Sequence, residues 1–161
     1  MKLEPSSALE SHVPPHIAIK RMLLLEHKLE CRIEVLPALL DAIEGLAGEH
    51  NWTDSFRTNV LLVVEELVVN AISYGGRTAE DGWVTVRLLG TPEGLSLEIA
   101  DNGVAFDPLA STPEPSLDQD LDSRAVGGLG VFFVRELTDS QHYARINGEN
   151  RVTLFKHWPA R

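Results

Sequence analysis

The sequence is poor in the features that mark exported and membrane proteins. Its only cysteine, Cys31, leaves no internal disulfide and fits a reducing compartment. The segment Met1–Ser7 has no apolar core of the kind that a signal peptide requires. The longest apolar run, around residues 60–69, is too short for a bilayer and is interrupted by two glutamates. These absences predict a cytoplasmic protein without a membrane-spanning segment.

Basic residues are also scarce. The chain has 14 Lys and Arg against 24 Asp and Glu, which gives a formal net charge of −10. A nucleic-acid surface needs basic side chains clustered on one face, whereas these are scattered along the sequence. The charge balance therefore predicts no nucleic-acid partner. It suits protein partners, or an anionic ligand that brings its own cation.

The length and composition predict one domain preceded by a leader. A chain of 161 residues with 43% hydrophobic content is long enough to bury one core. Residues 1–16 contain Pro5, Pro14 and Pro15 but few core-type side chains, so we predict a flexible leader there. The domain is then expected over residues 17–161.

Hydrophobic periodicity predicts an alternation of strands and helices in the domain. Strands are expected at 17–29, 83–89, 95–100, 141–146 and 151–158, and helices at about 34–46, 54–74 and 128–137. Residues 108–126 have no consistent period and contain prolines, which predicts a long loop acting as a lid. The order predicts an α+β two-layer sandwich, with helices on one face of a mixed, mainly antiparallel sheet.

The helix expected at 54–74 is apolar on nearly every face, yet it carries polar residues in its middle. Glu66 and Asn70 are four residues apart and so share one helix face. A buried carboxylate pairs, binds a metal or becomes protonated, because burying it without a partner is costly. The two side chains are therefore either mutually satisfied core polar groups or part of a binding site.

Two further segments carry glycines beside polar residues. Asp101 ends a predicted strand and precedes Asn102-Gly103, where a glycine allows close approach to a flat ligand. The run Gly127-Gly128-Leu-Gly130 lies at a helix start, where free backbone amides favour phosphate. Taken singly, the first is compatible with an ordinary turn and the second with a flexible hinge.

The three segments, in this order and spacing, resemble the N, G1 and G2 boxes of the Bergerat-fold (GHKL, histidine kinase-like) ATPases. The narrower match is to the anti-sigma regulatory factor branch, the RsbW and SpoIIAB-like serine/threonine kinases. It is carried by Glu-Glu-Leu-Val-Val-Asn-Ala-Ile-Ser-Tyr-Gly, Asp-Asn-Gly-Val-Ala-Phe-Asp-Pro and Gly-Gly-Leu-Gly-Val-Phe-Phe-Val-Arg. The resemblance covers roughly residues 20–158.

The resemblance implies ATP and Mg²⁺ as cofactors and gives a role to each site residue. It makes Glu66 the general base, Asn70 the Mg²⁺ ligand and Asp101 the acceptor of the adenine amino group. The remaining nucleotide contacts would come from a loop glycine, a lid arginine, the glycine run and an amide near the last strand: Gly103, Arg124, Gly127, Gly128, Gly130 and Asn150. Glu65 is expected to face the surface or a partner.

The resemblance implies a kinase that phosphorylates a STAS-type anti-anti-sigma protein and sequesters a sigma factor or similar regulator. Oligomeric state stays open between monomer and homodimer. Ala105 replaces the usual second glycine of the G1 box, and Asn150 stands where relatives often have threonine. A non-catalytic, nucleotide-dependent sequestering module is therefore the alternative. A histidine kinase is disfavoured because nothing upstream resembles a dimerising helical hairpin with a phosphoacceptor histidine.

Overall fold

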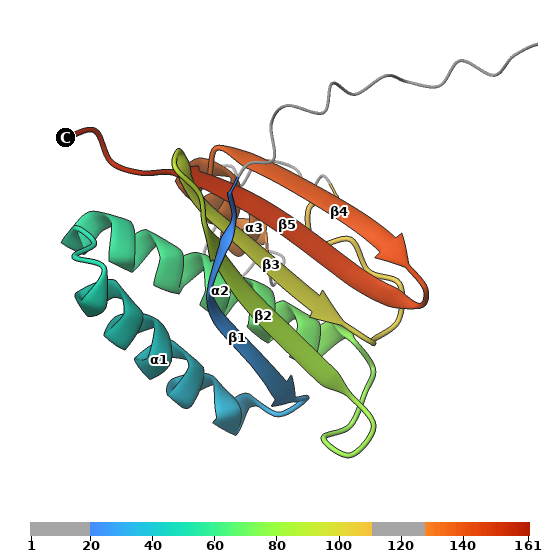
Figure 1. Cartoon of the computed structure of the whole chain (residues 1–161). Helices are drawn as coiled ribbons and strands as arrows, with labels where there is room; N and C mark the ends of the chain where they lie inside the picture. Colours follow the sequence, from blue (N-terminus) through green and yellow to red (C-terminus); the bar gives the residue numbers. More distant parts are fainter. Residues whose placement is uncertain (1–19, 111–127) are drawn as a thin grey trace, which may run out of the picture.

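Three α-helices cover one face of a five-stranded sheet in the computed structural model, which describes residues 20–110 and 128–161 (Figure 1). The elements, in chain order, are β1 (Met22–Glu30), the short 3-10 helix η1 (Ile33–Val35), α1 (Leu36–Glu49), α2 (Asp54–Tyr74), β2 (Trp83–Gly90), β3 (Gly94–Asp101), α3 (Gly128–Leu137), β4 (Ser140–Ile146) and β5 (Glu149–His157). The predicted α+β two-layer fold is confirmed.

The sheet has the strand order β1-β2-β3-β5-β4, and every pairing between the described strands is antiparallel. The sequence predicted a mixed sheet, whereas the described sheet has no parallel pair. Three of the four pairings, β1–β2, β2–β3 and β4–β5, join strands that follow one another along the chain. β5 returns beside β3, with Asp101 opposite Asn150 in the register.

Helix α2 lies next to both neighbours in the helical layer and also contacts the centre of the sheet. Its Thr53 N-cap accepts a hydrogen bond from the Phe56 N–H at 3.2 Å, which satisfies one of the free donors of the first turn. At the other end the Gly75 N–H donates to the Ala71 carbonyl at 3.1 Å. The predicted helix start and end are both confirmed.

The core lies between α2 and the inner face of the sheet. Period-two alternation directs every second side chain of a strand to this face. The fully buried side chains at the interface come from α2, β2, β3 and β5: Val60, Val63, Val64, Val68, Val84, Val86, Leu88, Leu95, Leu97 and Leu154. Because α2 and β3 are both held by this core, the end of the helix and the end of the strand have fixed positions.

The connection between β4 and β5 is the hairpin turn that the dipeptide Asn147-Gly148 favours. Asn147 and Gly148 both have positive φ, at 51° and 79°, as the type I′ turns favoured by Asn-Gly require. The turn sets the register in which Arg145 of β4 lies opposite Asn150 of β5.

Several sequence predictions fall on residues outside the described part of the chain. They are the leader at 1–16, most of the lid at 108–126, and the residues Arg124 and Gly127. The boundary at residue 17 therefore stays a prediction, and β1 is described from Met22. Among the described residues, no helix combines the length and hydropathy that crossing a membrane requires.

Candidate functional site

The C-terminal half of α2, the end of β3 and the start of β5 meet around a small cavity. Its volume is about 20 Å³, which is room for roughly one water molecule. It is lined by Leu67, Asn70, Ala71, Ile99, Asp101, Phe106, Pro108, Asn150 and Val152. Three residues predicted from separate segments, Asn70, Asp101 and Asn150, thus come together. A cavity of this volume is too small for a purine, so the lining would have to open for one to enter.

Strand alternation accounts for the inward direction of two of these polar side chains. Asp101 has the same parity along β3 as the buried Leu97 and Ile99, and Asn150 has that of the buried Val152 on β5. Both polar residues therefore belong to the core-facing rows. Each is nearly inaccessible, with exposed fractions of 8% for Asp101 and 3% for Asn150.

The Asp101 carboxylate is held through one of its two oxygens. Oδ1 accepts hydrogen bonds from the Gly103 N–H at 2.8 Å and from the Asn150 side-chain amide at 2.9 Å. Within the described residues no hydrogen bond uses Oδ2. The carboxylate is therefore oriented by the protein, and its second oxygen remains an acceptor for a donor that enters the cavity.

Asn150 ties the loop after β3 to the end of the sheet. Its Nδ2 donates to Asp101 Oδ1 and to the Val104 carbonyl at 2.8 Å. Its Oδ1 accepts from the Phe106 N–H at 3.2 Å, from the Tyr143 hydroxyl at 2.7 Å and from Arg145 at 3.0 Å. A buried amide with this many partners has one favoured orientation. In this geometry Asn150 positions Asp101 and the loop.

Sequence reasoning missed Tyr143 and Arg145. Arg145 also donates to the Gly103 carbonyl at 2.8 Å, so it ties the loop after β3 to Asn150 of β5. Both residues come from β4, which no sequence motif connects to the site. The Asn-Gly turn could have indicated Arg145, because a two-residue hairpin turn at Asn147-Gly148 places Arg145 opposite Asn150.

Gly103 allows the loop to lie directly on the end of α2. A Cβ placed at Gly103 would come within 2.6 Å of the Gly75 Cα and within 2.9 Å of the Gly75 carbonyl oxygen. The same contact includes a hydrogen bond from the Val104 N–H to the Gly75 carbonyl at 2.9 Å. The structure thus packs Gly103 against protein backbone, and the predicted approach of Gly103 to a flat ligand stays a prediction.

Glu66 lies on α2 beside the glycine of α3. A Cβ added to Gly130 would overlap the Glu66 carboxylate, with 1.8 Å to Oε1. Gly130 thus leaves the space that this carboxylate occupies. Burial raises the pKa of Glu66; a side-chain hydrogen bond with Asn70 acts in the opposite direction, and the nearby Glu65 carboxylate adds to the rise. A carboxylate with a raised pKa is better matched to general-base work near neutral pH.

The described residues fit a divalent cation that is coordinated mainly by water and by the phosphates of a bound ligand. No group of three or more His, Cys, Asp or Glu side chains in 20–110 and 128–161 could enclose a metal ion. Asn70, buried at 6% exposure, lines the cavity and carries one amide oxygen. Mg²⁺ keeps several waters and is commonly held by one or two protein oxygens together with phosphates. Asn70 would hold the ion in this arrangement.

The other predicted residues are placed as follows. Gly128 begins α3 and Gly130 follows in its first turn, whereas Arg124 and Gly127 lie outside the described residues. Glu65 is exposed, as predicted. The roles of all these residues stay predictions.

Comparisons with a family model and with individual proteins agree on one family. A model of the histidine kinase-like ATPase domain matches residues 29–156. The chain is 30% identical over 115 residues to the serine/threonine-protein kinase BtrW of Bordetella bronchiseptica, covering 71% of this chain and 80% of that protein. It is 26% identical over 101 residues to the serine-protein kinase RsbW of Listeria monocytogenes, covering 61% of this chain and 64% of RsbW.

A solved structure has the same fold. The RsbU and RsbW domains of Rv1364c from Mycobacterium tuberculosis match 85% of this chain with a TM-score of 0.58 and 17% sequence identity. The match covers 33% of that longer chain. At this identity the likeness concerns the fold alone.

We expect Gly103→Ala to destabilise the protein by about 1–3 kcal/mol, because the new methyl group meets the Gly75 backbone, which cannot rotate away. The matched control is Gly45→Ala in α1, where a Cβ meets nothing within 4 Å; it should stabilise by about 0.5–1 kcal/mol. Urea unfolding measures both. Equal effects of the two substitutions would contradict the close packing.

We expect Glu66→Gln to raise the melting temperature at pH 8 by more than at pH 5. The raised pKa means that ionised Glu66 is less favourable in the folded than in the unfolded protein. Its contribution to stability is therefore present below the unfolded pKa and is lost as pH rises through the folded pKa. Glutamine removes that loss. Scanning calorimetry at both pH values tests this, with Glu65→Gln as the exposed control; a gain independent of pH contradicts it.

Proposed function

Because the chain belongs to the histidine kinase-like ATPase domain family, we propose that it is an ATP- and Mg²⁺-dependent serine/threonine protein kinase. The observation that carries the proposal is the convergence of Asn70, Asp101 and Asn150 on one cavity, with Glu66 one helical turn before Asn70. The relatives are named as serine or serine/threonine kinases, which supports the same chemistry. The sequence predicts that the protein acts in the cytoplasm.

Recognition of adenine would depend on Asp101. Its Oδ1 is already engaged by Gly103 and Asn150, so Oδ2 would accept a hydrogen bond from the exocyclic amine. The neighbouring apolar side chains, Leu67, Ile99 and Val152, would pack against the flat base. A guanine base carries an oxygen in place of that amine and would face the carboxylate with an acceptor.

Phosphoryl transfer would depend on Glu66. Bound Mg-ATP would supply the phosphoryl group, and the ion would neutralise charge on the phosphates. Glu66 would take the proton from a partner's hydroxyl as that oxygen forms its bond to the γ-phosphorus and the bond to the β–γ bridging oxygen breaks. Asn70 would hold the ion, and Gly127, Gly128 and Gly130, with Arg124 from the lid, would contact the phosphates.

The protein substrate we propose is a serine or threonine of a STAS-type anti-anti-sigma protein, with a sigma factor or similar regulator as the competing partner. Support comes from the resemblance of the three motifs to anti-sigma kinases and from the similarity to RsbW. The exposed Glu65, beside the proposed base, would contact the partner.

Asp101→Asn tests the adenine contact. Asparagine keeps an Oδ1 acceptor for Gly103 and Asn150 but replaces Oδ2 with a donor. We expect ATP affinity to fall by about 1–3 kcal/mol, roughly 5- to 150-fold, while GTP affinity falls less or rises. Calorimetric titration with Mg²⁺ present measures both. The control is Asp139→Asn, whose carboxylate accepts from the His157 N–H at the far end of β5. An unchanged ATP-to-GTP ratio would refute this assignment.

Glu66→Gln tests the general base. The rate of transfer to a purified STAS protein encoded near this one should fall by about 10² to 10⁴, while ATP and partner affinities change little. Mass spectrometry for phosphoserine and phosphothreonine gives the rate, and Glu65→Gln is the matched control. If the wild type binds ATP and the partner but transfers no phosphate, the protein is the sequestering module. Ala105 is then the first position to test by substitution with glycine.

A further inference from the structure

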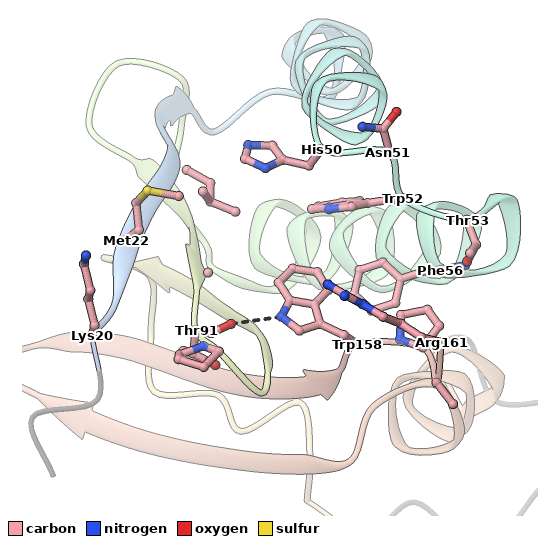
Figure 2. A pocket seen from close by; sticks show the side chains of 15 residues that line it. Lys20, Met22, His50, Asn51, Trp52, Thr53, Phe56, Thr91, Trp158 and Arg161 are labelled. Atoms are coloured by element: carbon pink, nitrogen blue, oxygen red, sulfur yellow. Dashed lines mark hydrogen bonds between the residues drawn. The ribbon is translucent and has the colours of Figure 1, made fainter.

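The largest cavity described is a groove far from the nucleotide site. It has a volume of about 670 Å³, within the range typical of ligand pockets. Figure 2 shows it between the start of β1, the α1–α2 connection and the end of β5. It is lined by Lys20, Met22, Leu24, His50, Asn51, Trp52, Thr53, Phe56, Gly90, Thr91, Pro92, Trp158, Pro159, Ala160 and Arg161.

The groove has an aromatic wall that is held rigidly. Trp52, Phe56 and Trp158 contact one another, with ring centroids 5.2 to 6.2 Å apart. The Trp158 indole N–H donates to the Thr91 carbonyl at 2.9 Å (Figure 2). Ordered aromatic side chains offer contact area at little cost in conformational entropy. Across from them, Met22 is 56% exposed, and methionine adapts readily to the shape of a partner.

The charge of the groove is opposite to that of the whole protein. The chain carries 24 acidic residues, yet none of the 15 lining side chains is acidic. Lys20 and Arg161 are basic, and His50 adds a titratable group. Three carboxylates adjacent in sequence to lining residues, Glu49, Asp54 and Glu93, are not themselves part of the lining. The N-terminus of α2 also adds positive potential at Thr53.

The groove and the nucleotide site lie at opposite ends of α2. Phe56 lines the groove and Asn70 the proposed nucleotide cavity, and their separation of 14 positions corresponds to about 21 Å along the helix axis. An occupant of the groove therefore has no direct contact with the proposed nucleotide.

We propose that this groove binds an acidic peptide segment of a protein partner, through an aliphatic or aromatic anchor on the aromatic wall and carboxylates against Lys20 and Arg161. The groove has room for the side chains of a short peptide, and the described part of its lining holds no acidic side chain, which matches an anionic ligand. The surface is additional to the proposed kinase site.

The test uses the full chain and a fluorescein-labelled hexapeptide with two glutamates on each side of a leucine–phenylalanine pair. Anisotropy should report binding that weakens with salt, and a peptide with lysines in place of the glutamates should bind at least tenfold more weakly. The unlabelled acidic peptide should alter tryptophan emission, because Trp52 and Trp158, two of the chain's three tryptophans, line the groove.

Two pairs of variants localise the binding. Lys20→Glu with Arg161→Glu should weaken the acidic peptide roughly tenfold. Lys28→Glu with Arg32→Glu changes the net charge equally outside the groove and should have little effect. Met22→Ser should weaken binding, whereas Leu23→Ser, 50% exposed and outside the lining, should not.

Three results would overturn the proposal. They are no binding of the acidic peptide by the full chain, equal binding of the basic peptide, and equal effects of the groove variants and their controls. Sedimentation adds a fourth: if the groove variants alone convert a dimer to monomers, the occupant is a second copy of the chain. ATP affinity should be the same in all these variants, so a failure here is distinguishable from a failure of the kinase proposal.

Discussion

The hydrogen bond between Asp101 and Asn150 is the contact on which the site depends. It joins two buried polar side chains that face each other across neighbouring strands. Left unpaired, either would carry the full cost of a buried polar group. Paired, they fix Oδ1 of Asp101 and hold the loop after β3 through Val104 and Phe106. Strand register and loop position are thereby coupled.

The second constraint is the close packing of two glycines, Gly103 and Gly130, against α2 and the residue that follows it. Gly103 lies on Gly75 at one end of the site, and Gly130 leaves room for Glu66 at the other. Glycine is needed at both places because of close approach, since any Cβ would meet backbone or carboxylate. The ionisable group at this helix surface is consequently partly desolvated, which raises the pKa of Glu66. The packing of Glu66 and its raised pKa therefore have the same structural origin.

Residue type and position along the chain singled out Asn70 and Asp101, and the structure places both on the lining of one cavity. Their parts in binding Mg²⁺ and adenine stay predictions. Asn150 was predicted to lie beside adenine. Its hydrogen bonds within the protein show that it also holds Asp101 and the loop after β3 in place. Tyr143 and Arg145 were missed because their relation to Asn150 is a matter of strand register, which local sequence does not record.

The sequence by itself determined the helices, the strands, the Asn-Gly turn and the family, because periodicity, caps and turn residues act over a few neighbouring positions. Only the tertiary structure decided that the described strands pair in antiparallel fashion throughout, that Asn70, Asp101 and Asn150 line one small cavity, and that Lys20, Trp52 and Trp158 share a groove. These features join residues distant along the chain, and their positions depend on how the layers pack, which no local pattern encodes.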